Sequence, residues 1–523
     1  MKEKNQEELI NKEKIILVLL FLLALTFFLW LHSTHIGWDF QTYVLNAKYW
    51  FADGDYFEWA RPPLVPLLLG IFSFFGWKAS EYVFIIFVTF LHFLSCIVFA
   101  KRFKINKVLF YAISLSPFVL ITGLSEGTEL LSLALLQLFL AFIETNFASF
   151  FLGLAFLARY PNLIFTPLLL FTLIRDRKKF LPNIFVFLLV ISPWLLFNFL
   201  TTGNAFTSIM DSYALNIKFR GYINQPFNIK DFILITNYLL PFFIAGIIRR
   251  KGTKFKAEDW LMIMFFVLAL FSYSRIPIKL TRYLFVALLP IFYLSSIAIE
   301  EAKKKSVIVF VLLSSSLFFF VLSLLIYINP LNYFKYLLIA ILPILITSYF
   351  LSIIIKKIGH VIVFLLLLLL LSFSFAILIY FTEIKNPIMQ EKSYLDVINE
   401  TKDFLNCGLS SNIHIQLNYF GIKSEGAPLK KEMIKKKLED GYRILFFKII
   451  PEPDYIKNET FLHQFPIIKE GKNYVLLGDK TRCALIRKIN QTYLESISEL
   501  YRVIYNENFS ISFYDLFFTN KTA

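Results

Sequence analysis

The sequence predicts an all-α polytopic membrane protein of about 13 transmembrane helices, followed by a small extracytoplasmic α/β domain at the C-terminus. The first observation is composition, because 57% of the 523 residues are hydrophobic and only 17% are charged. Soluble domains are about 45–50% apolar and about 25% charged. The second is that long apolar runs recur up to residue 381 and are absent afterwards. No water-facing fold could bury this much apolar surface, so a soluble enzyme is excluded.

The predicted spans follow from apolar runs near the length of about 20 residues that crosses a bilayer. The first run, residues 15–31, follows a charged N-terminus and has no small-residue cleavage site after it, so we expect an anchor. Residues 32–81 form an outer loop in which the short apolar stretch 64–77 predicts a surface helix. The other twelve spans are predicted at 82–100, 108–123, 129–143, 147–158, 162–174, 183–201, 233–248, 260–274, 283–299, 306–327, 336–355 and 359–381.

The orientation follows from the basic loops, which alternate along the chain. Five loops that fall on the same side as the N-terminus carry 4, 4, 5, 3 and 2 basic residues; they are 101–107, 175–179, 249–256, 303–305 and 356–357. The positive-inside rule places them and the N-terminus in the cytoplasm. The net charge of +16 is concentrated in residues 1–381, with 33 basic and 19 acidic side chains. The excess therefore encodes orientation, and nucleic-acid binding is not expected.

The region 382–523 is predicted to be a separate domain on the outer side, after a transmembrane domain of residues 1–381. It holds all five N-x-S/T sequons, which are used only outside the cytoplasm, although chance clustering in an Asn-rich segment is the alternative. These sequons are Asn399, Asn458, Asn490, Asn508 and Asn520. If the region is extracytoplasmic, Cys407 and Cys483 could form a disulfide.

Short periodic segments predict mixed helices and strands in this C-terminal region. Helices are expected at 393–405 and 430–439, and strands at 412–419 and 443–450. A hairpin is expected over 465–477, with a Glu-Gly-Lys turn. No metal or nucleophile motif is visible there.

Carboxylates that face outward are the first candidates for chemistry. Asp39 directly follows Trp38, a few residues beyond the first span, so it is expected near the membrane surface. A carboxylate held by aromatic side chains there could act as a general base toward a hydroxyl group. The alternative is that Asp39 caps a surface helix beginning at Phe40, a role for which Asp is well suited.

Further charged residues of this first loop are candidates for contacts with the acceptor or substrate; they are Asp53, Asp55, Glu58 and Arg61. The Asp-Gly-Asp stretch at 53–55 could bind a divalent cation, although a solvated turn is the alternative. No other cofactor is expected.

The second outer loop adds two acids at the mouth of the next span, Glu126 and Glu129. Helix capping is the alternative role for both.

Basic residues on the outer side are exceptions to the orientation rule. Arg275, Lys279 and Arg282 lie between two predicted spans, and Arg159 lies at an Ala-Arg-Tyr-Pro break. Arginine suits bidentate contacts to phosphate, whereas snorkelling to lipid headgroups is the alternative. Acids and cations on one side fit the transfer of a group from a lipid phosphate to a hydroxyl or amide, with the cations stabilising the departing phosphate.

In this arrangement the chain resembles the GT-C superfamily of polytopic glycosyltransferases, which use polyprenyl-phosphate sugars and include protein O-mannosyltransferases and aminoarabinose transferases of lipid A. The resemblance covers most of residues 14–300 and combines an acid after the first span with several short motifs. These are Tyr43 with Ala47, Gly54–Asp55, Pro62–Leu64, Thr128–Leu130 and the Arg-Tyr-Leu that starts at Arg282.

The resemblance implies roles for individual residues. Asp39 would be the catalytic base, Glu129 a second site acid, and Arg282 with Lys279 or Arg275 the donor-phosphate ligands, with inversion at the anomeric carbon. Many members have Asp-Glu in the first loop, but Asp39 is followed by Phe40. This departure weakens the match to protein O-mannosyltransferases, and the missing Trp-Trp-Asp-Tyr-Gly argues against an oligosaccharyltransferase catalytic subunit.

The sequence therefore favours a membrane glycosyltransferase that moves a single sugar, with mannose as one candidate, from a polyprenyl- or dolichyl-phosphate carrier. The acceptor would be a glycan, protein or lipid. A secondary transporter is the rival class, but the acids cluster in outer loops and no paired broken helices are visible. A lipid-linked oligosaccharide polymerase or ligase would share the carrier.

Overall fold

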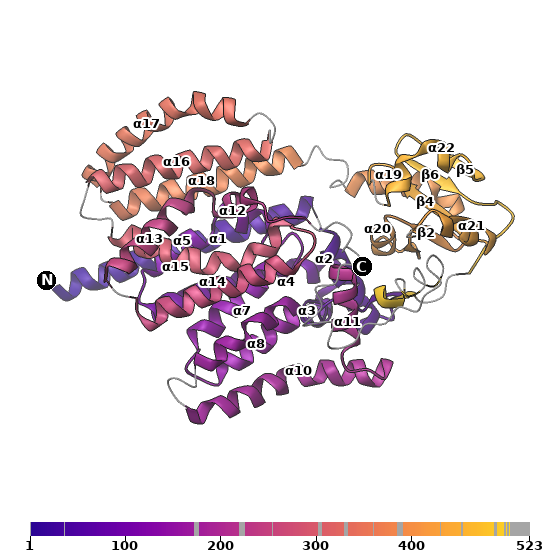
Figure 1. Ribbon diagram of the computed structural model, residues 1–523, viewed down its shortest axis with the longest axis horizontal. Coiled ribbons are helices and arrows are strands. Elements are labelled where there is room, and N and C mark those ends of the chain that lie inside the picture. The colour runs from indigo at the N-terminus through magenta and orange to yellow at the C-terminus, as the bar shows by residue number, and fades with distance from the viewer. Residues whose placement is uncertain are drawn as a thin grey trace. The chain divides into compact units, whose positions relative to one another are not determined.

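The computed structural model describes residues 2–502, apart from 36, 172–176, 219–224, 254, 302–305, 329–332, 359, 384–390, 429, 451–452, 486–488, 496–497 and 499–501. The predicted sequons at Asn508 and Asn520 lie outside the described residues. The chain divides into two compact units, whose helices and strands are labelled in Figure 1. One contains Met1–Leu31, Tyr82–Leu196 and Tyr222–Thr382; the other contains His32–Glu81, Phe197–Gly221 and Glu383–Ala523. The bounds of these units differ from the predicted division at residue 381, because His32–Glu81 and Phe197–Gly221 group with the C-terminal residues.

Helices dominate the first 383 residues. Their bounds are α1 (Lys2–Thr34), α2 (Trp38–Phe51), α3 (Leu64–Phe72), α4 (Trp77–Phe103), α5 (Lys107–Ser114), α6 (Pro117–Thr122), α7 (Glu129–Ala141), α8 (Phe147–Ala158), α10 (Phe180–Thr202), α11 (Thr207–Tyr213), α12 (Ile229–Thr236), α13 (Leu240–Thr253), α14 (Ala257–Arg275), α15 (Leu288–Glu301), α16 (Ser306–Ile328), α17 (Tyr333–Ile358) and α18 (His360–Glu383). Among the 3-10 helices, η2 (Tyr160–Leu169) follows α8, and η7 (Thr281–Ala287) leads directly into α15.

Seven helices among the described residues are long and apolar enough to cross a membrane, so the chain is an integral membrane protein. They match seven of the predicted spans and are Asn11–Thr34, Trp77–Phe103, Arg177–Thr202, Ile229–Arg250, Ala257–Arg275, Thr281–Glu301 and Ile308–Ile328. Of the six other predicted spans, 336–355 and 359–381 fall largely on the long helices α17 and α18, whereas the remaining four fall on shorter helices. The run 108–123 is divided into α5 and α6 because Pro117 has no N–H for a continuous helix, and the run 162–174 falls largely on η2, which contains Pro167.

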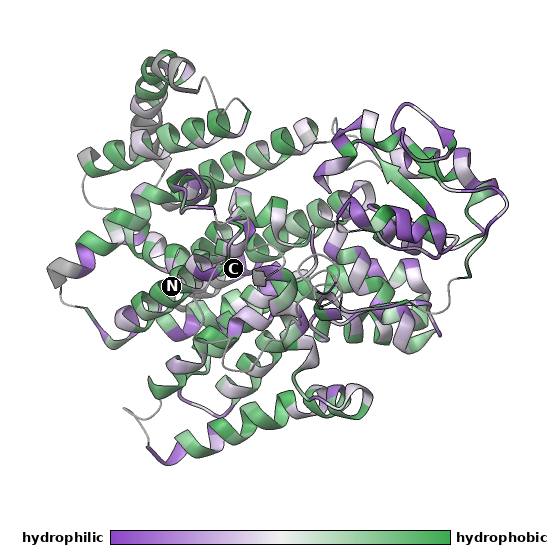
Figure 2. Cartoon of the chain, turned by 45° about the vertical axis from the view of Figure 1, so that its right-hand side comes forward, coloured by the Kyte–Doolittle hydropathy of each residue, from purple (hydrophilic) through white to green (hydrophobic). Residues whose placement is uncertain are grey.

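Helices α13 and α15 of the first unit pack with their backbones close together. A Cβ added at Gly246 of α13 would lie 2.3 Å from the Leu294 carbonyl oxygen of α15. Only glycine fits there, as in many membrane helix contacts. Figure 2 shows hydrophobic residues along most of the helices, whereas hydrophilic residues are more frequent in the part of the chain that contains the strands.

The C-terminal region is an α/β unit, as predicted. Its elements are α19 (Glu391–Thr401), β2 (Leu409–Ser411), α20 (His414–Tyr419), β3 (Glu425–Gly426), α21 (Glu432–Glu439), β4 (Arg443–Phe447), α22 (Glu459–Leu462), β5 (Ile467–Glu470), β6 (Tyr474–Leu477) and β7 (Ile489–Gln491). Five strands form one sheet in the order β3-β2-β4-β6-β5, in which β2 is parallel to β3 and β4 and the other pairs are antiparallel.

Alternation along β4 buries both faces of this sheet. Leu445 and Phe447 pack with α19 and α20, whereas Ile444 and Phe446 pack on the opposite face with α21. The predicted helices at 393–405 and 430–439, the strand at 443–450 and the hairpin over 465–477 are confirmed, with shifted ends.

The strand predicted at 412–419 is wrong, because most of this segment forms α20. Asn412 ends the preceding strand by donating to the Phe447 carbonyl oxygen and accepting from the Phe447 N–H. Five successive residues from His414 to Asn418 are buried. The alternation of polar and apolar residues here therefore does not correspond to one exposed and one buried face of a strand.

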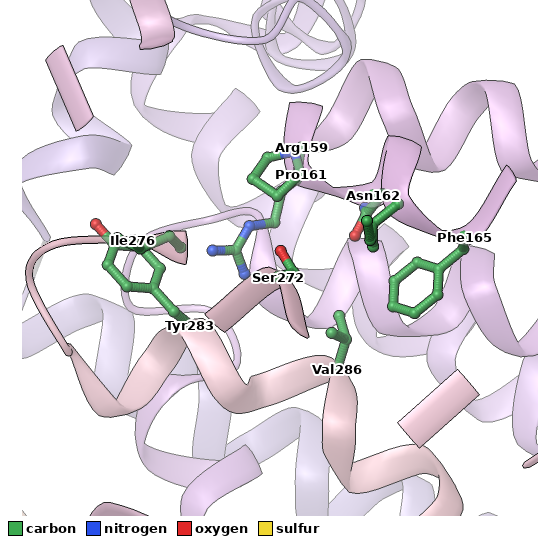
Figure 3. Close-up of a pocket in the computed structure, with 9 residues that line it drawn as sticks. Arg159, Pro161, Asn162, Phe165, Ser272, Ile276, Tyr283 and Val286 are labelled. Atoms are coloured by element: carbon green, nitrogen blue, oxygen red, sulfur yellow. The ribbon is translucent and has the colours of Figure 1, made fainter. Parts of the chain in front are cut away.

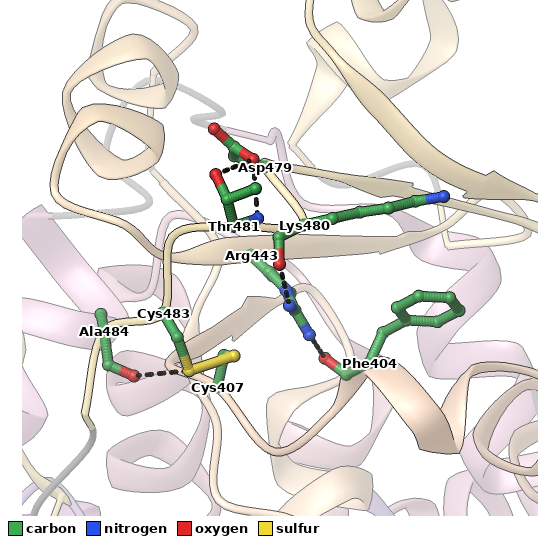
Figure 4. Close-up of a disulfide and its surroundings, with 8 residues drawn as sticks. All are labelled: Phe404, Cys407, Arg443, Asp479, Lys480, Thr481, Cys483 and Ala484. Atoms are coloured by element: carbon green, nitrogen blue, oxygen red, sulfur yellow. Dashed lines mark hydrogen bonds between the residues drawn. A yellow bond between two sulfur atoms is a disulfide. The ribbon is translucent and has the colours of Figure 1, made fainter.

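Cys407 and Cys483 form a disulfide, 76 residues apart in the chain (Figure 4). Nearby, the Gly408 N–H donates to the Ala484 carbonyl oxygen at 2.7 Å, and Arg443 donates to the Phe404 carbonyl oxygen at 2.6 Å. The bond therefore joins the start of β2 to the segment that leads to β7.

Replacing both cysteines by serine is expected to destabilise the C-terminal region by about 4 kcal/mol, because the closed loop is long. Thermal unfolding in detergent, followed by limited proteolysis of the C-terminal region, measures this loss. Reduced wild-type protein should behave like the double variant, and an unchanged proteolysis midpoint would contradict the prediction.

Candidate functional site

A chain of buried ion pairs lies within residues 39–61, in the second unit. The Arg61 guanidinium lies 2.7 Å from the Asp39 carboxylate and 2.7 Å from the Glu58 carboxylate. The side chain of Glu58 has no exposed surface, whereas 16% of the Asp39 side chain is exposed. Arg61 therefore joins an inner carboxylate to an outer one that reaches the surface.

Helix α2 positions Asp39. The helix begins at Trp38, and Gly37 is the N-cap residue, so Asp39 lies in the first turn. The alternative in which Asp39 caps a helix beginning at Phe40 is therefore wrong. A carboxylate in the first turn is favoured by the helix dipole, and Arg61 adds a direct partner.

Strand β1 (Tyr56–Glu58) positions Glu58, and its neighbours hold it in place. Asn46 of α2 donates to the Glu58 carbonyl oxygen and accepts from the Glu58 N–H, both at 2.9 Å. The Tyr56 hydroxyl donates to the carboxylate at 3.3 Å. Sequence reasoning missed Asn46 and Tyr56, although it named both Glu58 and Arg61, which are three residues apart.

Burial sets the charge states of this ion-pair chain. It raises the pKa of the Glu58 carboxyl, and the nearby Arg61 charge opposes this shift. Burial also acts to lower the pKa of the Arg61 guanidinium, but the charges of Asp39 and Glu58 outweigh burial and raise it. Arg61 is thus a permanent cation between two acids.

Asp53 and Asp55, the candidate ligands of a divalent cation, lie at a tight turn before β1. Asp55 pairs with Lys423 at 3.0 Å, and Asp53 adopts a left-handed backbone (φ 53°) in a tight turn. The Gly54 N–H donates to the Lys48 carbonyl oxygen at 3.0 Å, which closes this turn. Within the part of the chain that the structure describes, no group of three or more His, Cys, Asp or Glu side chains could hold a metal ion.

Two further ion pairs, each between a glutamate and an arginine, lie in the first unit. Glu129 is the first residue of α7, almost fully buried, and its carboxylate lies 3.5 Å from the Arg159 guanidinium. Glu126 lies 3.7 Å from Arg282. The N-cap residue of α7 is Thr128, so neither acid is the cap of this helix.

Arg159 also lines a small pocket of about 20 Å³, and all of its lining residues belong to the first unit. Figure 3 shows the guanidinium group directed toward the side that carries Tyr283 and Ser272. Asn162 lines the same pocket and is fixed by donating to Ser132 Oγ and to the Ala155 carbonyl oxygen, both at 2.7 Å. Arg159, Asn162, Ser272 and Tyr283 are thus polar side chains that line this pocket.

The remaining predicted cations lie apart from this pocket lining. Lys279 donates to the carbonyl oxygens of Tyr273, Ser274 and Ile276, so its ammonium group caps the end of α14. Burial lowers the pKa of Lys279. Arg275, the last residue of α14, is exposed and lies over the Phe271 ring at 5.2 Å.

These features define an integral membrane protein with acidic and basic pairs in both units. The same fold occurs in solved structures of ArnT from Cupriavidus metallidurans. The structure bound to undecaprenyl phosphate matches 90% of this chain and 99% of its own chain, with a TM-score of 0.60 and 12% identity. The apo structure matches 88% and 97%, with the same TM-score and identity.

The predicted resemblance to GT-C proteins is thereby confirmed at the level of the fold. No family model matches the chain, and no curated protein matches its sequence. Asp39 with Arg61 lies in one unit, and Glu129 with Arg159 in the other.

Proposed function

We propose that the protein is a GT-C glycosyltransferase that transfers a single sugar from a polyprenyl-phosphate carrier to an acceptor outside the cytoplasm. The observation that carries the proposal is the Asp39 carboxylate, partly exposed and held by Arg61 on a fold shared with a carrier-bound ArnT structure. ArnT is a GT-C aminoarabinose transferase. Mannose is the first sugar to test, and a hydroxyl or amide of a glycan, protein or lipid is the acceptor.

In the proposed reaction, Asp39 takes the proton of the acceptor group as its oxygen or nitrogen attacks the anomeric carbon. The bond from that carbon to the phosphate oxygen breaks, and its electron pair leaves with the lipid phosphate. Direct displacement inverts the configuration. Arg159 and Arg282 of the first unit are the proposed phosphate ligands, because fixed cations stabilise the charge that develops on the leaving group.

We also propose the predicted orientation, with thirteen crossings, the N-terminus in the cytoplasm and the C-terminal domain outside. The disulfide between Cys407 and Cys483 supports an oxidising compartment for that domain. The sequon residues Asn399, Asn458 and Asn490 are exposed, as acceptors must be. Protease added to sealed, right-side-out cells should cleave the C-terminal domain, and full protection would contradict this orientation.

Replacing Arg159 by Ala is expected to raise the KM for the carrier sugar by about 10- to 100-fold, since a charged hydrogen bond contributes about 1.5–3 kcal/mol. The assay uses purified protein in proteoliposomes and a labelled polyprenyl-phosphate sugar. Arg249→Ala is the matched control, because Arg249 lies in a predicted cytoplasmic loop and, like Arg159, pairs with a glutamate, Glu301, at 3.0 Å. An unchanged KM in Arg159→Ala would remove Arg159 from the phosphate site.

A further inference from the structure

The segment that follows the disulfide reaches the strand that carries Glu58. Strand β7 pairs in parallel with β1, and Glu58 lies opposite Gln491. The Ile489 N–H also donates to the Asp55 carbonyl oxygen at 2.6 Å. These residues are more than 430 positions apart in the sequence and belong to the same compact unit.

A small core supports this two-stranded pairing, which would be marginal alone. Leu45 of α2, Tyr56 of β1, Ile415 of α20 and Ile489 of β7 are buried against one another. The Trp38 ring packs against this core and lies beside Asp39 in the sequence. The C-terminal region therefore contributes apolar surface directly beneath the first turn of α2.

A second anchor lies three residues beyond the end of β7. The Leu494 N–H donates to the Asp211 carboxyl of α11 at 2.8 Å. Asp211 has no exposed surface, and it lies close enough to Glu58 for their charges to interact. The C-terminal segment is thus tied to two outer segments of the chain, β1 and α11.

Polar contacts add a third connection. Lys423 pairs with Asp55 at 3.0 Å, immediately before β1. The Tyr419 hydroxyl donates to Glu81 at 2.8 Å, and the ammonium groups of Lys48 and Lys78 both lie within 6 Å of the Tyr419 ring centroid. Three elements of the first outer region therefore contact α20 and the residues after it.

We infer that residues 489–494 of the C-terminal domain, together with Asp211, are positioning residues that hold β1 and so orient Glu58, Arg61 and the proposed base Asp39. The contacts run from β7 to β1, from Glu58 to Arg61, and from Arg61 to Asp39. This inference rests on the proposed function. It assigns the C-terminal domain a part in catalysis although none of its residues needs to touch the substrate.

Asp211→Ala tests the inference because it removes the acceptor for the Leu494 N–H. A displacement of about 1 Å at a reacting group can reduce the rate about 100-fold, so we expect kcat to fall about 10- to 100-fold. The KM for the carrier sugar should change less than about twofold, because uniform binding is untouched. Amide hydrogen exchange at residues 55–58 should become faster.

Asp211→Asn is the conservative variant. Burial raises the pKa of the Asp211 carboxyl to about 8, so the group is mostly protonated at pH 7 and the Asn amide resembles it. Asn keeps an acceptor oxygen for the Leu494 N–H, and we expect kcat within about threefold of wild type. Loss of kcat in both variants would overturn the inference, since removal of the acceptor would not explain it.

Lys423→Met provides a variant that should fold normally, because its pair with Asp55 is partly exposed and contributes little to stability. We expect a decrease in kcat of about two- to fivefold, since a partly exposed ion pair contributes up to about 1 kcal/mol. Lys435→Met is the matched control, because Lys435 is exposed and pairs with Glu439 of its own helix α21. Equal kcat values in the two lysine variants would count against the inference.

The failure of this inference can be distinguished from failure of the proposed function. If Asp39→Asn abolishes transfer while Asp211→Ala keeps wild-type kcat, positioning by the C-terminal domain is refuted and the glycosyltransferase proposal stands. If Asp39→Asn transfers sugar at the wild-type rate, the base assignment fails and the inference fails with it.

Discussion

Asp39→Asn is expected to reduce sugar transfer by about 10²- to 10⁴-fold, the usual contribution of a general base. The amide has the same shape but cannot accept the proton of the acceptor group. Arg61 keeps its buried partner Glu58, so the loop should fold as in the wild type. Single-turnover transfer from a labelled polyprenyl-phosphate sugar in proteoliposomes measures the chemical step directly.

The control for this substitution is Asp454→Asn in the C-terminal domain, because the Asp454 side chain is 87% exposed and pairs locally with Lys457. Its transfer rate should equal that of the wild type. The KM for the carrier should stay unchanged in Asp39→Asn, in contrast to Arg159→Ala. Wild-type transfer by Asp39→Asn would show that another group is the base.

The membrane part of the fold could be predicted because one property, the length of apolar runs, defines a span. That property does not report breaks within a run. Pro117 divides one predicted span, and Pro167 lies within the 3-10 helix η2 of another. The backbone chemistry of proline therefore determines where these helices break, which hydropathy alone does not predict. In the C-terminal region, α20 is buried on several sides, and alternation is then uninformative.

The site was predicted less completely, for reasons of distance along the chain. Asp39 and Glu129 stood out because each follows or starts an apolar run on the outer side. The partner of Asp39 is Arg61, 22 residues away, and no sequence periodicity connects them. Lys279 looked like a phosphate ligand because it is an outward cation, but backbone carbonyl groups at the end of α14 use its ammonium group. Such pairings depend on tertiary structure.

The buried pair of Arg61 and Glu58 is expected to contribute more to stability than to any other property of the protein. In Arg61→Leu, the Glu58 carboxyl is left buried without its cation. Removing one partner of a buried ion pair costs about 3–5 kcal/mol. We therefore expect a clear decrease in the free energy of unfolding, measured by thermal unfolding in detergent, together with loss of transfer.

This loss should depend on pH. Burial already raises the pKa of Glu58 above its ordinary value of 4.5, and removal of Arg61 raises it further. The folded protein then binds the Glu58 proton more tightly than the unfolded protein does. Stability is therefore retained below pH 4.5 and decreases as the pH rises through the folded pKa. Arg61→Leu should unfold at a lower temperature at pH 8 than at pH 5, by a larger margin than the wild type.

The double variant Arg61→Leu/Glu58→Gln separates stability from catalysis. Replacing both charged partners removes the buried unpaired charge, so most of the lost stability should return and the added pH dependence should disappear. Transfer should stay low, because Asp39 still lacks the guanidinium that holds it in place. If the double variant recovers both stability and transfer, Arg61 serves only to neutralise Glu58, and the orientation of Asp39 must come from α2 alone.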